Sequence, residues 1–271
     1  MDKKRALNDG LIDLPLRALL TAEEEKLRAE APIRALVTAS WAELEPEAGR
    51  YSDAAFTALR DRLARITALD AEAVVCLFRE DEPAWFTGRG GWEREDNIVS
   101  FLRFAGKLAR ETAHLAAGYM TFCAPNDSAW ARRRDPIRFY RRLSHMACAH
   151  VRAYRLMRDT CDSRGYTDRP IGIGMRFYPL RGVLPDRKDA AFPPLAPAMY
   201  QSIPLRAFDA GKFSPPMVNT LRAQSGHWCD FIAVFPVRDG EAALAAAKSV
   251  TDTPLWLAKG IEETEGTESD V

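Results

Sequence analysis

Six short apolar runs, separated by longer amphipathic stretches, constrain the fold of this chain more than any other feature of its sequence. They cover residues 33–39, 73–78, 117–123, 171–177, 230–235 and 254–258, and Pro, Gly or charged residues flank them. Strands that are buried on both faces read as short, continuous apolar runs, and they are typical of parallel sheets. The runs therefore predict six strands of a parallel sheet.

The stretches between these runs carry the spacing of helices that face a core. Apolar residues recur every three or four positions in residues 53–69, 97–115 and 136–160. Residues 21–30 begin with Thr-Ala-Glu-Glu, which is close to a capping box. Strands that alternate with helices predict an α/β fold, a parallel sheet with right-handed crossovers that is either open or closed into a barrel.

The length of the chain favours one large domain. It has 271 residues, and a single TIM-type (β/α)8 barrel needs about 250. We therefore predict one barrel domain over residues 1–261 and an acidic, disordered tail over residues 262–271. Only residues 10–20 offer a candidate first strand, and no last strand follows Gly260. The barrel is accordingly expected to be incomplete or irregular, with open edges that a second copy of the chain would cover as a homo-oligomer.

The charge balance and the cysteines exclude several classes of protein. Lys and Arg number 38, as do Asp and Glu, so no overall field favours nucleic acid or a membrane surface as a partner. The five cysteines form no CxxC pair, so neither a disulfide framework nor a zinc site is expected. No signal-peptide pattern and no run of about 18 apolar residues occurs, which predicts a cytoplasmic protein. No cofactor motif is present, and we predict no cofactor.

An ordered set of short motifs carries a resemblance to a known family. The motifs are SWAELEPEAGRY at residues 40–51, LFREDEP at 77–83, GGW at 90–92, TFCAPN at 121–126, IGI at 171–173 and DFIA at 230–233. Their order and spacing resemble glycoside hydrolase family 1, the β-glucosidase family. The resemblance implies a (β/α)8 barrel whose site lies at the carboxyl ends of the strands.

The resemblance also implies where the hydrolytic residues belong. Retaining glycosidases use two carboxylates about 5 Å apart, one as acid/base and one as nucleophile. The acid/base position falls on Ala124, and the nucleophile position falls on Ala258 or Lys259. None of these residues is a carboxylate. The sequence therefore predicts a degenerate and shortened member of the family that has lost hydrolysis.

Other residues remain as candidates for binding a ligand at the former sugar pocket. Arg79 and Arg176 lie at predicted strand ends and favour an anionic ligand, such as a carboxylated or phosphorylated sugar. In the alternative interpretation, Arg79 pairs with Glu80 or Asp81, Arg176 pairs with another carboxylate, and both only fill the vacated space. The resemblance adds further ligand-binding candidates, namely Cys123, Asn126 and Trp41, and Trp41 also matches a scaffold position where packing is expected.

Two enzymatic hypotheses stay open beside the binding protein. A glycosidase with relocated carboxylates would use Asp81, Glu82 or Asp127, whereas the alternative for Asp127 is the cap of a turn. An enzyme of another class would use Cys123 as a nucleophile if a base lay close to it. Otherwise Cys123 is an inert buried thiol. The expected partner of the binding protein is a carbohydrate or an anionic small molecule.

Overall fold

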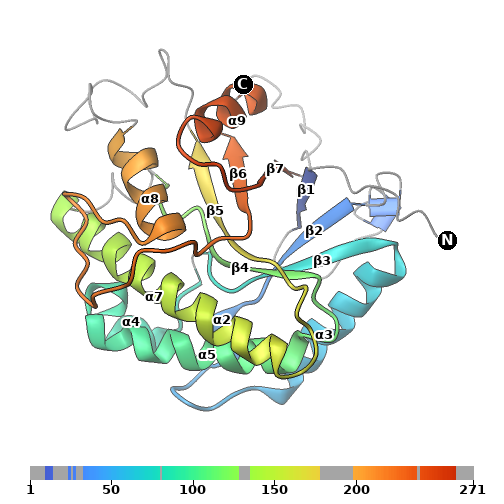
Figure 1. The fold of residues 1–271 in the computed structure, drawn as a ribbon. Helices are drawn as coiled ribbons and strands as arrows, with labels where there is room; N and C mark the ends of the chain where they lie inside the picture. Colours follow the sequence, from blue (N-terminus) through green and yellow to red (C-terminus); the bar gives the residue numbers. More distant parts are fainter. Residues whose placement is uncertain are drawn as a thin grey trace, which may run out of the picture.

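The computed structural model describes residues 10–14, 24–25, 27–28, 33–79, 81–127, 135–177, 198–236 and 239–260. Its seven parallel strands are β1 (Gly10–Asp13), β2 (Ile33–Thr38), β3 (Ala71–Cys76), β4 (Gly118–Cys123), β5 (Ile171–Phe177), β6 (Ile232–Pro236) and β7 (Leu255–Gly260). They follow one another around a closed barrel in chain order (Figure 1). The barrel closes because β1 pairs with both β2 and β7.

The barrel is incomplete, as predicted, because the described residues form seven strands instead of eight, but its edges are paired and it is not open. Six strands coincide with the predicted apolar runs, and β5 has the predicted bounds. The seventh strand, β1, lies within residues 10–20, where the sequence offered only a weak candidate. With β1 paired on both sides, the described strands leave no open edge for a second subunit to cover. Association into homo-oligomers therefore stays a prediction, and it no longer has an open sheet edge to support it.

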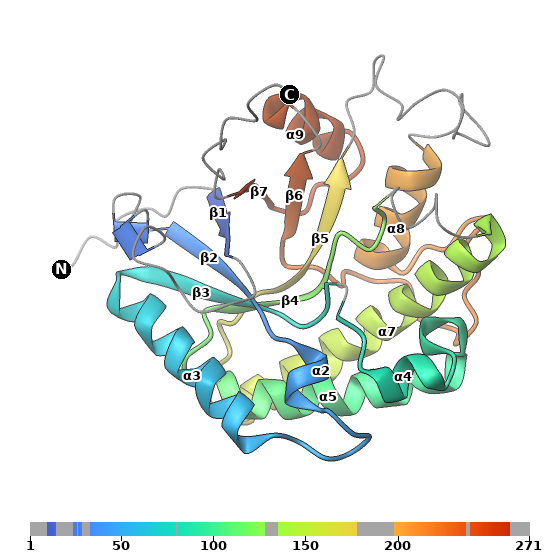
Figure 2. The ribbon, with the colours of Figure 1, turned by 180° about the vertical axis from the view of Figure 1, so that it is seen from behind.

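Helices surround the barrel and bury one face against it. They are α2 (Trp41–Leu44), α3 (Asp53–Ala68), α4 (Ala84–Gly88), α5 (Ile98–Thr112), α7 (Pro136–Asp162), α8 (Ile203–Ala210) and α9 (Gly240–Lys248), with short helical turns at Gly91–Glu93, Glu95–Asn97 and Ala198–Ser202. Figures 1 and 2 show α3, α5 and α7 along one side of the barrel, with α9 beside β6. Most of the predicted helix over residues 21–30, and the whole predicted tail over 262–271, lie outside the described residues. No helix in the described ranges is long and apolar enough to cross a membrane.

The inside of the barrel is filled by side chains. The rings of Phe231 and Trp256 stack with centroids 3.6 Å apart, and the guanidinium group of Arg34 lies 4.1 Å from the centre of the Trp256 ring. Gly172 and Gly174 of β5 leave the space that neighbouring side chains occupy, since an added Cβ would meet them at under 3 Å. A filled interior confines any ligand to the ends of the barrel.

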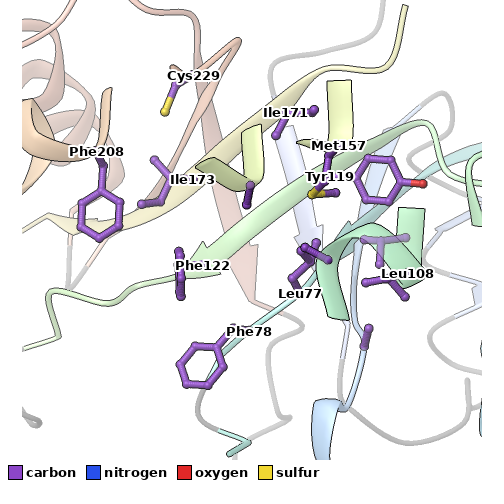
Figure 3. Close-up of a cluster of buried hydrophobic side chains, with 14 of the residues drawn as sticks. Leu77, Phe78, Leu108, Tyr119, Phe122, Met157, Ile171, Ile173, Phe208 and Cys229 are labelled. Atoms are coloured by element: carbon purple, nitrogen blue, oxygen red, sulfur yellow. The ribbon is translucent and has the colours of Figure 1, made fainter. Parts of the chain in front are cut away.

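A larger core lies between the barrel and its helices. Phe122 of β4 packs edge-on against Phe208 of α8, with ring centroids 6.0 Å apart. Figure 3 shows this part of the core, in which Phe122, Ile173 and Phe208 point toward one another. His150 of α7 is buried beside it and bonds Thr121 of β4 at 2.7 Å. These contacts fix α7 and α8 against the strands that carry the candidate site.

Candidate functional site

The carboxyl ends of the strands form one mouth of the barrel, where alternate side chains point inward. Leu11 and Leu36 belong to the interior cluster, and Asp13 and Thr38 follow two residues later on the same strands. Because side chains alternate along a strand, Asp13 and Thr38 face the interior too. Cys76 of β3 is part of the interior cluster and lies opposite Thr38 in the strand register. The mouth thus carries polar and thiol groups on consecutive strands.

An ion pair between Arg79 and Asp13 crosses this mouth. Nη2 of Arg79 donates to both carboxylate oxygens, at 2.6 and 2.7 Å. Since β2 lies between β1 and β3 in the sheet, the pair passes over the end of β2. The two side chains are 34% and 21% exposed, so solvent reaches the pair. The sequence predicted Glu80 or Asp81 as the alternative carboxylate partner of Arg79. The partner is Asp13 and not Asp81, and Glu80 lies outside the described residues.

A second ion pair joins Arg176 at the end of β5 to Asp127 in the loop after β4. Nε of Arg176 lies 3.0 Å from Oδ2 of Asp127. The backbone N–H of Asp127 donates to the carbonyl oxygen of Ala124 at 3.0 Å, which closes a turn. Each arginine of the mouth therefore has an aspartate beside it, as the alternative interpretation expected for Arg176. The two pairs together contribute donors and acceptors but no net charge.

The other carboxylates considered for a relocated hydrolytic pair are also engaged. Asp81 accepts a hydrogen bond from the hydroxyl group of Ser40, and its Oδ2 lies 3.4 Å from the backbone nitrogen of Ala42. Glu82 accepts from Nη2 of Arg142 at 2.6 Å, and this pair is almost completely buried. Both carboxylates therefore already have hydrogen-bond partners within the protein.

The two positions that the resemblance assigns to hydrolysis both lie at the mouth. Ala124 follows β4 with a φ of 50°, in the left-handed region, and packs against the interior cluster. Its backbone N–H donates to the carbonyl oxygen of Gly174 at 2.9 Å. On β7, Ala258 faces the interior cluster, whereas Lys259 is exposed. The interior-facing group is a methyl at both positions, and a methyl group transfers no proton and attacks no carbon.

Two thiols meet below the Arg79 side chain. Cys76 donates to the carbonyl oxygen of Phe78 at 3.5 Å, and the backbone N–H of Cys123 donates to the same oxygen at 2.8 Å. The neighbouring thiol of Cys76 and the guanidinium group of Arg79 hold the pKa of Cys123 below its usual value, although burial opposes them. Burial raises the pKa of Cys76. Cys123 therefore has the more acidic thiol of the two.

Trp41 and Asn126 serve the scaffold. Trp41 is fully buried, stacks on Phe104 with centroids 5.2 Å apart and donates from its indole nitrogen to Glu45. The amide nitrogen of Asn126 donates to two backbone carbonyl oxygens, and its oxygen accepts from the backbone N–H of Arg176 at 2.9 Å. Neither residue offers a free group to a ligand in this structure.

Three residues of the mouth were not predicted from the sequence, namely Asp13, Thr38 and Cys76. Thr38 and Cys76 were detectable in principle, because each lies near the end of a predicted strand on the face that Leu36 and Val74 share. Asp13 gave no signal, because its strand was only weakly marked. Among the described residues, no group of three His, Cys, Asp or Glu side chains is arranged to hold a metal ion.

Two hollows in the described part of the protein lie away from the mouth. A cavity of about 470 Å³ lies beside the first half of α7 and is lined mainly by apolar residues, including Ile137, Tyr140 and Val218. Another, of about 580 Å³, lies at the opposite end of the barrel, beside the loop that leads into β7. A site for a polar ligand needs convergent polar groups as well as space. The mouth has that chemistry, with both arginine–aspartate pairs.

A closed parallel barrel with helices outside and polar groups at the carboxyl ends of its strands defines a protein of the TIM-barrel class, here with seven strands in the described part of the chain. Solved structures with this fold include glycosidases. A glycoside hydrolase family 1 β-glucosidase from Exiguobacterium antarcticum matches with a TM-score of 0.63 and 17% identity, over 79% of this chain and 52% of that one. The β-glycosidase from Pyrococcus horikoshii matches with a TM-score of 0.62 and 18% identity, over 80% and 51%.

A third similar structure is the AHE enzyme from Alicyclobacillus herbarius, with a TM-score of 0.65 and 19% identity over 79% of this chain and 52% of that enzyme. This chain thus spans about half the length of these three proteins. No protein-family model and no curated protein matches the sequence. The likeness establishes a fold of the family 1 β-glucosidase type.

Proposed function

We propose that this protein is a shortened and degenerate relative of glycoside hydrolase family 1 that binds a carbohydrate at the barrel mouth without hydrolysing it. The observation that carries the proposal is the pair of methyl groups, Ala124 and Ala258, at the two interior-facing strand ends where the resemblance requires carboxylates. Without them, neither protonation of the leaving group nor attack on the anomeric carbon has a residue to perform it.

The arginine–aspartate pairs favour a neutral sugar over an anionic one. A sugar hydroxyl group both donates and accepts, and a guanidinium group beside a carboxylate offers both kinds of partner. An anionic ligand would have to displace Asp13 from Arg79, or Asp127 from Arg176, before it gained a contact of the same kind. The anionic ligand predicted from the two arginines alone is therefore the weaker candidate.

Isothermal titration calorimetry tests the ligand class. The probes are methyl β-glucoside, glucuronic acid and glucose 6-phosphate, titrated into the full chain. We expect heat of binding from the neutral glycoside and little from the two anions. In Asp13→Asn the order should reverse, because Arg79 loses its carboxylate partner and becomes available to the ligand's anion. The matched control is Asp168→Asn, which changes an exposed aspartate paired with Arg169 outside the mouth.

Turnover is measured with nitrophenyl β-glycosides. We expect none above the rate in buffer. Release of nitrophenol that disappears in Asp127→Asn would replace this proposal by the active glycosidase with relocated carboxylates. An absence of heat with all three probes would remove the binding function and leave Arg79 and Arg176 as packing residues.

A further inference from the structure

The two thiols below Arg79 form a site that carbohydrate binding does not explain. Cys76 and Cys123 come from neighbouring strands, both lie in the barrel interior, and both bond the carbonyl oxygen of Phe78, Cys76 through its thiol and Cys123 through its backbone N–H. Cys123 is 5% exposed whereas Cys76 is fully buried, so Cys123 is the thiol nearer the solvent. The neighbouring thiol of Cys76 and the positive charge of the Arg79 guanidinium group, which Asp13 holds in place, lower the pKa of the Cys123 thiol.

Two polar atoms beside this thiol pair have no hydrogen-bond partner within the described parts of the chain. They are Oγ1 of Thr38 and Nε of Arg79. Thr38 is only 6% exposed, and it lies opposite Cys76 in the register of β2 and β3 with its side chain on the interior face. A buried polar group without a partner costs about 1–3 kcal/mol, so such groups mark places where a further polar atom is accommodated.

We propose that Cys123 is a reactive thiol that small hydroperoxides oxidise to a sulfenic acid, with the added oxygen held by Thr38 and Arg79. Both unpartnered groups are donors, and a sulfenate oxygen is an acceptor that carries charge. Oγ1 of Thr38 and Nε of Arg79 can thus donate hydrogen bonds to the sulfenate oxygen, and both donors lack a partner within the described residues of the reduced protein. The guanidinium group of Arg79 balances the charge of the attacking thiolate.

The reaction balances with the hydroperoxide as the only oxidant. An electron pair of the Cys123 thiolate attacks the terminal peroxide oxygen, a sulfur–oxygen bond forms and the oxygen–oxygen bond breaks. The departing alkoxide or hydroxide takes the proton of the transferred hydroxyl group and leaves as an alcohol or as water. The product is the sulfenate anion. Sulfur is oxidised by two electrons, and the peroxide is reduced by two.

Trapping of the sulfenic acid tests the site directly. The full chain is treated with hydrogen peroxide in the presence of dimedone, and the adduct on each cysteine is followed by mass spectrometry of its peptides. Cys148 is the internal control, because burial raises the pKa of its thiol. We expect Cys123 to be labelled at least about tenfold faster than Cys148, since thiolate character governs this oxidation.

Two variants test whether the oxidation of Cys123 depends on the Thr38 hydroxyl group or only on the solvent exposure of the thiol. Thr38→Val removes the hydroxyl group at nearly constant shape, and Thr67→Val makes the same change on α3, away from the mouth. Thr38→Val should slow labelling of Cys123 about tenfold, the effect of one hydrogen bond to a charged group, and Thr67→Val should not. Equal labelling of Cys123 and Cys148 in the unaltered chain would overturn the proposal, as would equal rates in the two variants. No sugar enters the assay, so its outcome is independent of carbohydrate binding.

Discussion

The glycines of β5 test how tightly the barrel interior is filled. A Cβ added to Gly172 would lie 2.2 Å from the carbonyl oxygen of Phe231, which belongs to the backbone next to β6. A Cβ added to Gly174 would lie 2.6 Å from the ring of Phe235 and 2.9 Å from the sulfur of Met120. A ring or a thioether can rotate away, whereas the carbonyl oxygen moves only with its chain. The two glycines should therefore respond differently to the same added methyl group.

The expected magnitudes follow from the atoms that must move. Overpacking a filled core costs about 1–3 kcal/mol, occasionally more. We expect Gly174→Ala to lower the free energy of unfolding by about 1–2 kcal/mol and Gly172→Ala by about 3 kcal/mol or more. Gly88→Ala is the control, since nothing lies within 4 Å of its added Cβ at the end of α4. There alanine should leave stability unchanged or raise it by up to about 1 kcal/mol.

Urea unfolding followed by circular dichroism measures all three variants under one condition. We expect Gly172→Ala to have the lowest free energy of unfolding and Gly174→Ala the next lowest, whereas that of Gly88→Ala should equal or exceed the value for the unaltered protein. If Gly172→Ala unfolded at the same urea concentration as the unaltered protein, the barrel interior would have space for an added methyl group and would not be filled. A ligand could then enter the barrel rather than stay at its mouth.

Two further perturbations probe buried polar groups. Burial lowers the pKa of His150 from 6.5 to about 4, so the unfolded chain binds a proton in that window that the folded chain does not. The contribution of His150 to the free energy of unfolding should be fully present above pH 6.5, and it should fall by roughly 3 kcal/mol toward pH 4. In urea unfolding across this range, the free energy of unfolding should depend less steeply on pH for His150→Gln than for the unaltered protein. Arg142→Met should cost about 3 kcal/mol, because it leaves the Glu82 carboxylate buried without its partner. The double variant with Glu82→Gln should recover most of that loss, which a double-mutant cycle would measure.

The strands were predictable because the barrel buries both of their faces. Residues 171–177 form a continuous apolar run, and they are β5. Helix α9 was not predicted, although Asp239 caps it by accepting from the backbone N–H groups of Glu241 and Ala242. Its core face consists of alanines, whose small side chains give little contrast with the rest of the helix. Periodicity detects helices that bury large side chains more readily than helices of this kind.

The candidate site was predictable only in part. Arg79 and Arg176 could be placed at the mouth because each ends or follows an apolar run, but their partners could not be named. Asp13 belongs to a strand of four residues, which is too short to show a pattern. Asp127 meets Arg176 only through the turn after β4. Ion pairs between distant parts of a chain depend on loop geometry that local sequence does not encode.

The thiol pair depends on an irregularity that sequence alone does not show. Simple alternation from Met120 would turn Phe122 inward and Cys123 outward. The register between β4 and β5 shifts between Met120 and Cys123, so Cys123 joins the interior cluster while Phe122 packs in the outer core. A bulge of this kind re-aims one side chain, and here it brings Cys123 next to Cys76.

Binding without hydrolysis is tested most directly by proton NMR of methyl β-glucoside incubated with the protein. Saturation transferred from the protein to the sugar reports binding, and the anomeric signals in the same sample report cleavage. The account predicts saturation transfer that Asp13→Asn alters, with the glycoside's anomeric signal undiminished over days. Growth of the anomeric signals of free glucose, dependent on the protein and absent in Asp127→Asn, would contradict it.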